Sequence, residues 1–92
     1  MKLTEKREGN SIKIIGMRTY ASPEMAKERY EKIIELLNES GMNIERNSSR
    51  VNGEDIGLTI RGIISNEELY EKFKQSLESL WFLFLKVYKC LN

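Results

Sequence analysis

An apolar stripe runs through the last quarter of the chain at the spacing of an α-helix. Its members follow one another at intervals of four or three residues, which places them on one face of that helix: Leu69, Phe73, Leu77, Leu80, Phe84, Val87 and Leu91. Ser65 or Asn66 is suited to cap the helix, and Glu67 and Glu68 favour its first turn. Such a stripe predicts that the helix lies on a sheet of the same domain.

The last turns of this helix are apolar on a second side as well. Trp81, Leu85 and Tyr88 extend the stripe on one flank, and Phe82 lies further round. A helix that is apolar most of the way round is buried on more than one side. We therefore interpret Trp81, Phe82, Leu85 and Tyr88 as the anchors of a protein-binding surface. The alternative is that another helix of the domain covers them.

The first half of the chain predicts a strand followed by a helix. Residues 1–10 are charged and are interpreted as a flexible lead-in, and residues 11–20 contain the β-branched residues of a strand. Ser22 and Pro23 are typical of the cap and first position of a helix, and Gly41 is suited to end it. Residues 11–92 are then expected to form one domain.

A hairpin is predicted from Met42 to Ile64. Asn52 and Gly53 form a strong turn signal, and apolar residues alternate after them. A two-residue loop would set polar residues opposite the core, whereas a three-residue loop would bring Met42 and Ile44 to the apolar side. We favour the second register, with the polar incoming arm as an edge strand or as a strand that pairs across a dimer.

These elements together predict an α+β fold with the order β-α-β-β-α. Its three-stranded antiparallel sheet would be covered on one face by two helices and would dimerise through the sheet. The chain of 92 residues is long enough for one domain.

Composition argues against several classes of function. The chain has no histidine, a single cysteine and no glycine-rich phosphate loop, so no catalytic residue, metal or cofactor is expected. Its longest apolar run has six residues, whereas a membrane span needs about 20. The charged N-terminus lacks the features of a signal peptide. We expect a cytoplasmic protein in a reducing compartment.

The basic residues leave two interpretations open. Arg46, Arg50 and Arg61 would share the hairpin, and Lys13 and Arg18 the first strand. The chain holds 15 Lys and Arg residues against 14 Asp and Glu residues, without the basic excess of an independent nucleic-acid binder. The scatter fits a solvated surface, and the alternative is that Arg46, Arg50 and Arg61 contact tRNA.

The order of elements resembles the small dimerisation subunit of the KEOPS complex, the Pcc-type or CTAG/LAGE family. The segment Ser79-Leu80-Trp81-Phe82-Leu83-Phe84-Leu85-Lys86-Val87-Tyr88 matches the serine, the bulky apolar run and the Lys-Val step of archaeal members. The helix start Ser22-Pro23-Glu24 also fits the family. The chain departs from the family at Leu69-Tyr70, where a Leu-Arg is usual, and at Glu78-Ser79, where an Asn-Ser is usual.

The resemblance implies a non-catalytic assembly subunit in an archaeal complex that makes threonylcarbamoyladenosine in tRNA. Its partners would be the threonylcarbamoyl transferase subunit, docked through the last helix, and a second copy or a Pcc-type paralogue as dimer. Contact with tRNA would be indirect. Two alternatives stay open: a stand-alone RNA-binding module that uses the sheet face, and a viral or plasmid-borne inhibitor that binds a host protein with the same helix.

Overall fold

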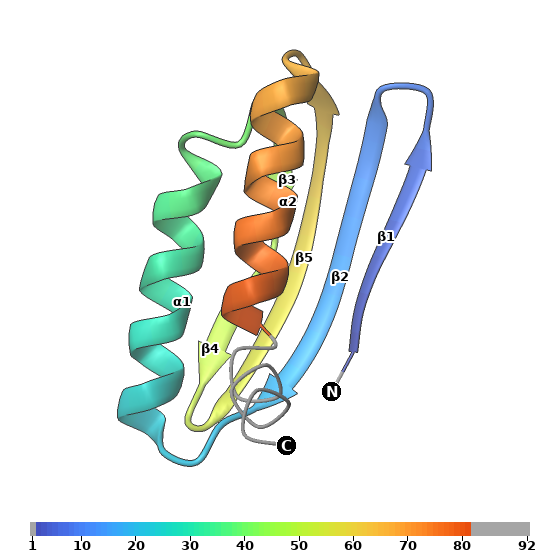
Figure 1. Cartoon of the computed structure of the whole chain (residues 1–92). Coiled ribbons are helices and arrows are strands. Elements are labelled where there is room, and N and C mark those ends of the chain that lie inside the picture. The colour runs from blue at the N-terminus through green and yellow to red at the C-terminus, as the bar shows by residue number, and fades with distance from the viewer. Residues whose placement is uncertain (1, 82–92) are drawn as a thin grey trace, which may run out of the picture.

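The computed structural model describes residues 2–81 of the chain. Its elements follow in the order shown in Figure 1: β1 (Lys2–Glu8), β2 (Ser11–Thr19), α1 (Pro23–Leu37), β3 (Met42–Asn47), β4 (Arg50–Asn52), β5 (Asp55–Ile64) and α2 (Glu67–Trp81).

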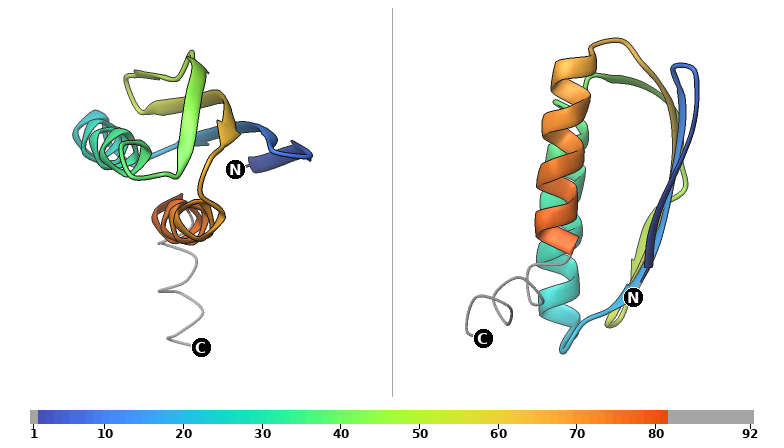
Figure 2. Two further views of the ribbon diagram at one scale, coloured as in Figure 1. Left: turned by 90° about the horizontal axis from the view of Figure 1, so that it is seen from above. Right: turned by 45° about the vertical axis from the view of Figure 1, so that its right-hand side comes forward.

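The strands form one antiparallel sheet, and both helices lie on the same face of it. The strand order is β1-β2-β5-β3, and β4 pairs with the same edge of β5 as β3 does. Figure 2 shows that no helix of the described chain lies on the other face. The predicted α+β class with an antiparallel sheet and two helices is confirmed. The three-stranded sheet and the order β-α-β-β-α are wrong, because the sheet has five strands.

The two extra strands have different origins. The segment predicted as a flexible lead-in is β1, which forms a hairpin with β2 in which Glu8 lies opposite Ser11. The loop between them is Gly9-Asn10, and Gly9 has a φ of 61°, which the first central residue of a type II′ turn requires. The other extra strand arises because the incoming arm of the predicted hairpin is split into β3 and β4.

The polar pattern of β1 hides its role as a strand. Its inward residues are Leu3, Glu5 and Arg7, and the two charged ones bind α2. The Tyr70 hydroxyl donates to the Glu5 carboxylate, and Lys74 Nζ lies 3.3 Å from the same carboxylate. Arg7 donates to both oxygens of Glu67, at 3.0 and 2.5 Å. These bonds attach an edge strand to the helix layer with little apolar surface.

The starts of the helices follow the predicted signals. The Ser22 hydroxyl accepts from Met25 N at 3.2 Å at the start of α1, and Asn66 Oδ1 accepts from Leu69 N at 3.1 Å at the start of α2. Gly41 has the predicted left-handed conformation, with a φ of 69°, but α1 ends at Leu37, so Gly41 does not end the helix as predicted. Its carbonyl accepts from the amides of Ser65 and Asn66 at 2.8 and 3.0 Å, which joins the two helix-flanking loops.

A β-bulge decides the register of the hairpin. The loop is Gly53-Glu54, a two-residue loop rather than the predicted three-residue one, since Asn52 lies opposite Asp55. The register shifts between Ile44 and Arg46, so Met42 lies opposite Ile64 and Ile44 opposite Gly62. Without this bulge, Ile44 would lie on the same side of the sheet as Arg46 and face away from the helices. The predicted placement of Met42 and Ile44 on the apolar side therefore holds, but a bulge produces it.

The core lies between the sheet and the helices. Alternate residues of β2 and β5 are buried there, and they pack with the inner stripes of α1 and α2. The buried apolar residues of the strands are Ile12, Ile14, Ile56, Leu58, Ile60 and Ile64. Those of the helices are Ala26, Ile33, Leu37, Tyr70, Phe73, Leu77 and Trp81.

Candidate functional site

The face of the sheet that no described helix covers is called the open face below. Alternation along β2 and β5 decides which side chains reach it, because successive residues of a strand point to opposite faces. On β2 the buried residues Ile12 and Ile14 alternate with Lys13 and Ile15, which project from the open face.

Four basic residues form a straight row across the open face. Lys6 of β1 lies opposite Lys13 of β2, Lys13 lies opposite Arg61 of β5, and Arg61 lies opposite Arg46 of β3. Each strand of the path β1-β2-β5-β3 thus contributes one cation, and we call these four residues the basic row. Like charges directly opposite each other destabilise a sheet, so this alignment is not explained by folding.

A fifth cation lies on the same face. Arg50 of β4 is opposite Gly57, four residues along β5 from Arg61. The acidic residues of this face lie toward its ends or its edge. Glu8 is beside the first hairpin loop, Asp55 is beside the second and accepts from the Thr19 hydroxyl at 2.6 Å, and Glu45 is at the bulge.

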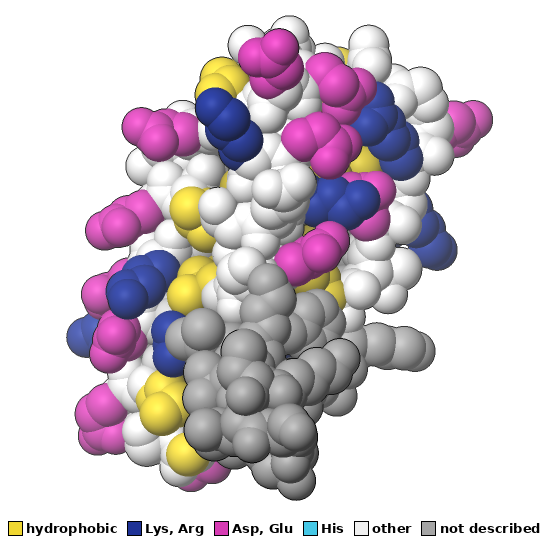
Figure 3. Space-filling model, in the orientation of Figure 1, with side chains coloured by type: hydrophobic (Ala, Val, Ile, Leu, Met, Phe, Trp, Pro, Cys, Tyr) yellow, Lys and Arg dark blue, Asp and Glu magenta, His cyan; other side chains and the backbone are white. Residues whose placement is uncertain are grey.

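Charge separates between the two layers of the molecule. The helices α1 and α2 together contain eight Asp and Glu residues against five Lys and Arg residues. The five strands contain eight Lys and Arg residues against four Asp and Glu residues. A chain with a formal net charge of +1 therefore has a basic sheet and an acidic helix layer. Figure 3 shows the helix side, where acidic and basic side chains are intermixed.

The open face has two hollows. One, of about 400 Å³, is lined by Lys6, Lys13 and Arg61 of the basic row together with Glu45 and residues of the first hairpin. The other, of about 660 Å³, lies around Gly57 and is bounded by Ile15 and Met17 on β2 and by Arg50 on β4. We call the second hollow the Gly57 notch.

Apolar side chains accompany the cations. Met17 is 71% exposed, Ile63 is 39% exposed and Ile15 is 37% exposed, and all three belong to strand positions that face away from the helices. The open face therefore combines positive charge with apolar contact surface.

Comparison with protein families, with curated proteins and with solved structures found no match to this chain. The geometry of the described residues therefore carries the functional interpretation.

The predicted tRNA-contacting residues share one face. Arg46 and Arg61 are neighbours in the basic row, and Arg50 lies further along the same side. Lys13 joins them, whereas Arg18 points to the helix side, where its guanidinium lies 4.5 Å from the centre of the Tyr20 ring. Sequence reasoning missed Lys6, because it took β1 for a flexible lead-in. The Gly9-Asn10 loop before a β-branched run is the signal that could have found this strand.

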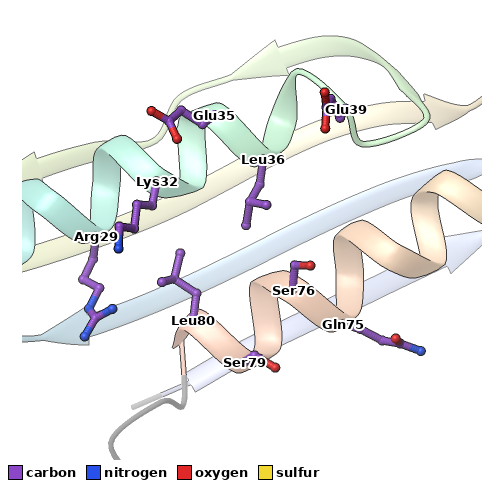
Figure 4. A pocket seen from close by; sticks show the side chains of 9 residues that line it. All are labelled: Arg29, Lys32, Glu35, Leu36, Glu39, Gln75, Ser76, Ser79 and Leu80. Carbon is purple, nitrogen blue, oxygen red and sulfur yellow. The ribbon is translucent and has the colours of Figure 1, made fainter.

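A third surface depression lies between the helices on the side away from the sheet. This groove, of about 890 Å³, is lined from α1 by Arg29, Lys32 and Leu36 and from α2 by Gln75 and Leu80, among others. In Figure 4 the side chains of Leu36 and Leu80 point toward each other across it. Its lining mixes both charges with small polar groups, so no single ligand chemistry is favoured there.

The predicted partner-binding anchors have a different placement. Trp81 is fully buried in the core of the domain and is one of its largest buried side chains. The described conformation therefore does not offer its indole to a partner. Phe82, Leu85 and Tyr88 lie outside the described residues, so their role as anchors stays a prediction.

Within residues 2–81, no cluster of three or more metal-ligating side chains occurs. In the same part of the chain, no helix has the length and the apolar character needed to cross a bilayer.

Proposed function

We propose that this protein is a non-catalytic RNA-binding protein that holds RNA on the open face of its sheet. The observation that carries the proposal is the basic row, in which four strands each contribute one cation to a single line across the open face. Phosphate contacts from Lys and Arg supply most of the affinity of such interfaces.

The dimensions of the row favour a polymer over a small anion. Neighbouring strands lie about 4.8 Å apart, so the four cations span roughly 14 Å. A single phosphate or carboxylate contacts only part of such a line. Arg50, displaced from the row by four residues along β5, lengthens the basic surface in a second direction.

Charge also argues against a second copy on this face. Two open faces pressed together would set basic rows against each other, and like charges across an interface cost several kcal/mol. The edges of the sheet at β1 and at β3 and β4 each pair on one side only. The predicted dimer through the sheet would therefore form at an edge, and it stays a prediction.

The test is RNA affinity measured at several salt concentrations. Lys13→Ser/Arg61→Ser removes two members of the basic row, and we expect weaker binding to single-stranded RNA. The slope of log K against log salt should shrink by about 1.4, since each phosphate contact to a single strand contributes about 0.7. Lys27→Ser/Lys72→Ser is the matched control, because it removes the same charge from exposed positions of the two helices.

Unchanged binding in the first double variant, or an equal loss in both, would contradict the proposal. The second outcome would mean that net charge alone attracts RNA to the protein.

The resemblance to the KEOPS small subunit supports a more specific form of the proposal. In that form the chain is an assembly subunit that docks a threonylcarbamoyl transferase and helps it to engage tRNA. Light scattering on the chain alone, and mixed with a transferase subunit from the same genome, tests this form. A joint peak supports it, whereas a monomer that ignores the transferase leaves RNA binding as the function to be explained.

A further inference from the structure

We infer that the Gly57 notch receives one unstacked nucleobase of a single-stranded RNA whose phosphates lie on the basic row. This inference rests on the proposed function and names the part of the RNA, other than its phosphates, that the open face binds. It concerns the part of the open face that the basic row does not occupy.

The floor of the notch is open because residue 57 has no side chain. A Cβ built on Gly57 would meet nothing within 4 Å. Glycine is not required there by its backbone, since Gly57 has no positive φ. Glycine weakens the interior of a strand and often marks a site where a ligand approaches the backbone closely. At this position a ligand explains the absent side chain better than folding does.

The two walls differ in chemistry. Met17, directly opposite Gly57 on β2, and Ile15 form an apolar wall, and Met17 is the most exposed large apolar residue of the described chain. A thioether makes favourable contacts with aromatic rings. On the other side, Arg50 is directly opposite Gly57 on β4, and Ser48 and Asn52 line the same wall. A guanidinium can stack on a base, and amide and hydroxyl groups can bond its edge.

The position of the notch suits a base attached to a phosphate chain on the row. Gly57 is four residues from Arg61 along β5, which is roughly 14 Å at about 3.4 Å per residue. Thr59 lies between them on the same face, so the surface that joins the two is continuous.

We infer one bound base rather than a run of bases, because the described open face carries no aromatic side chain. Every aromatic side chain within residues 2–81 belongs to the helix layer or to the core: Tyr20, Tyr30, Tyr70, Phe73 and Trp81. The described open face therefore lacks the row of aromatic platforms on which single-strand binders stack successive bases.

Gly57→Val is the decisive variant, because it fills the notch and leaves every charge in place. Valine suits a strand, so the variant should fold with no loss of thermal stability. We expect its affinity for a short labelled oligouridylate to fall about tenfold, the effect of losing one stacked base. Its affinity for inorganic polyphosphate, a polyanion without bases, should not change. Asn43→Val, on the same face but outside the notch, is the control and should bind both as the wild type does.

Gly57→Ala and Met17→Ser provide a second route. The smaller alanine should give a smaller loss than valine, and removal of the exposed Met17 thioether should weaken oligouridylate binding without affecting the fold. These variants keep the inference testable if Gly57→Val does not fold.

The inference is overturned if Gly57→Val and Met17→Ser bind oligouridylate as the wild type does, or if duplex RNA binds as tightly as single-stranded RNA. Either result leaves RNA binding through phosphates intact. Failure of the wild type to bind either oligouridylate or polyphosphate would instead overturn the proposed function itself.

Discussion

The two faces of the sheet use the same strands but have opposite relations to charge. On the covered face, the charged residues of β1 are paired: Arg7 with Glu67, and Glu5 with Tyr70 and Lys74. On the open face, four cations lie in line, with like charges as cross-strand neighbours. Paired charge on one face and repelling charge on the other indicate that the first serves folding and the second serves a ligand.

Changes on the covered face should alter stability, and changes on the open face should alter binding with little effect on stability. The predictions below test this division, in order of decreasing effect on the free energy of unfolding.

Gly41→Ala should have the largest effect. An added Cβ would lie 2.5 Å from Asn66 O and 2.9 Å from Tyr70 N, which are backbone atoms that cannot rotate away. Its φ of 69° adds strain for any other residue. We expect the free energy of unfolding, measured by urea titration, to fall by about 4 kcal/mol.

Gly53→Ala is the matched control for Gly41. Gly53 has a φ of 60°, but its added Cβ meets nothing within 4 Å. Gly53→Ala should therefore lower the free energy of unfolding only by the cost of backbone strain, about 1 kcal/mol. Equal losses in the two variants would mean that the contact between Gly41 and the start of α2 does not matter.

Ile14→Ala and Ile15→Ala compare the faces at adjacent positions. Ile14 is 3% exposed on the covered face, and Ile15 is 37% exposed on the open one. Ile14→Ala should lose about 3 kcal/mol of stability through a cavity in the core, and Ile15→Ala less than about 1 kcal/mol. Ile15→Ala should instead weaken RNA binding. A large stability loss at Ile15 would show that another part of the protein covers the open face.

The buried tyrosines should make the covered face sensitive to high pH. Burial is the main cause that raises the pKa of Tyr20 and of Tyr70, and for Tyr70 the hydrogen bond to Glu5 raises it further. Both phenols hold their protons more tightly when folded. Their contribution to the free energy of unfolding is complete below pH about 10, the ordinary pKa of tyrosine. As the pH rises above that value, each tyrosine loses this contribution at about 1.4 kcal/mol per pH unit.

Denaturation midpoints between neutral pH and about pH 11 check this, with Tyr70→Phe as the comparison. The variant should begin less stable, because it leaves the Glu5 carboxylate without its phenol partner, and then decline less steeply above pH about 10. An unchanged slope would mean that Tyr70 ionises as easily in the folded state as in the unfolded chain.

Arg61→Thr should have the smallest effect, with a sign opposite to the others. It removes a cation that lies between Lys13 and Arg46, and threonine suits a strand. We expect the free energy of unfolding to rise by about 0.5 kcal/mol at low salt, because repulsion between the cations is relieved. The gain should be smaller at high salt. A loss of stability would show that Arg61 makes a contact that folding needs.

Sequence reasoning found the elements whose signals are local. The capped start of α1, a strand within residues 11–20, a cap of α2 at Ser65 or Asn66 and the left-handed conformation of Gly41 were all predicted, and the structure has them. It failed at β1, since only Leu3 among the inward residues of that strand is apolar. A strand held to its neighbour helix by ion pairs has no apolar alternation to detect.

The candidate site was predicted only in its parts. Arg46, Arg50 and Arg61 were interpreted, together with Lys13 and Arg18, as a scatter on a solvated surface. Contact of the three arginines with tRNA was the alternative. The missing strand concealed Lys6, and the predicted three-residue loop concealed the register of the two-residue Gly53-Glu54 loop, in which Arg46 lies opposite Arg61. Trp81 was predicted at the surface because periodicity gives its angle on the helix but not what covers it. It is buried.

The sequence by itself determined where each helix begins, because capping depends on neighbours a few positions away. Tertiary structure alone decided that four cations from four strands stand in one line. Their alignment depends on pairings between residues far apart in the chain, such as Lys13 with Arg61, and on the two-residue Gly53-Glu54 loop, whose register sets Arg46 opposite Arg61. A local pattern carries no information about such distant registers, yet a single shift turns every side chain of a strand to the other face.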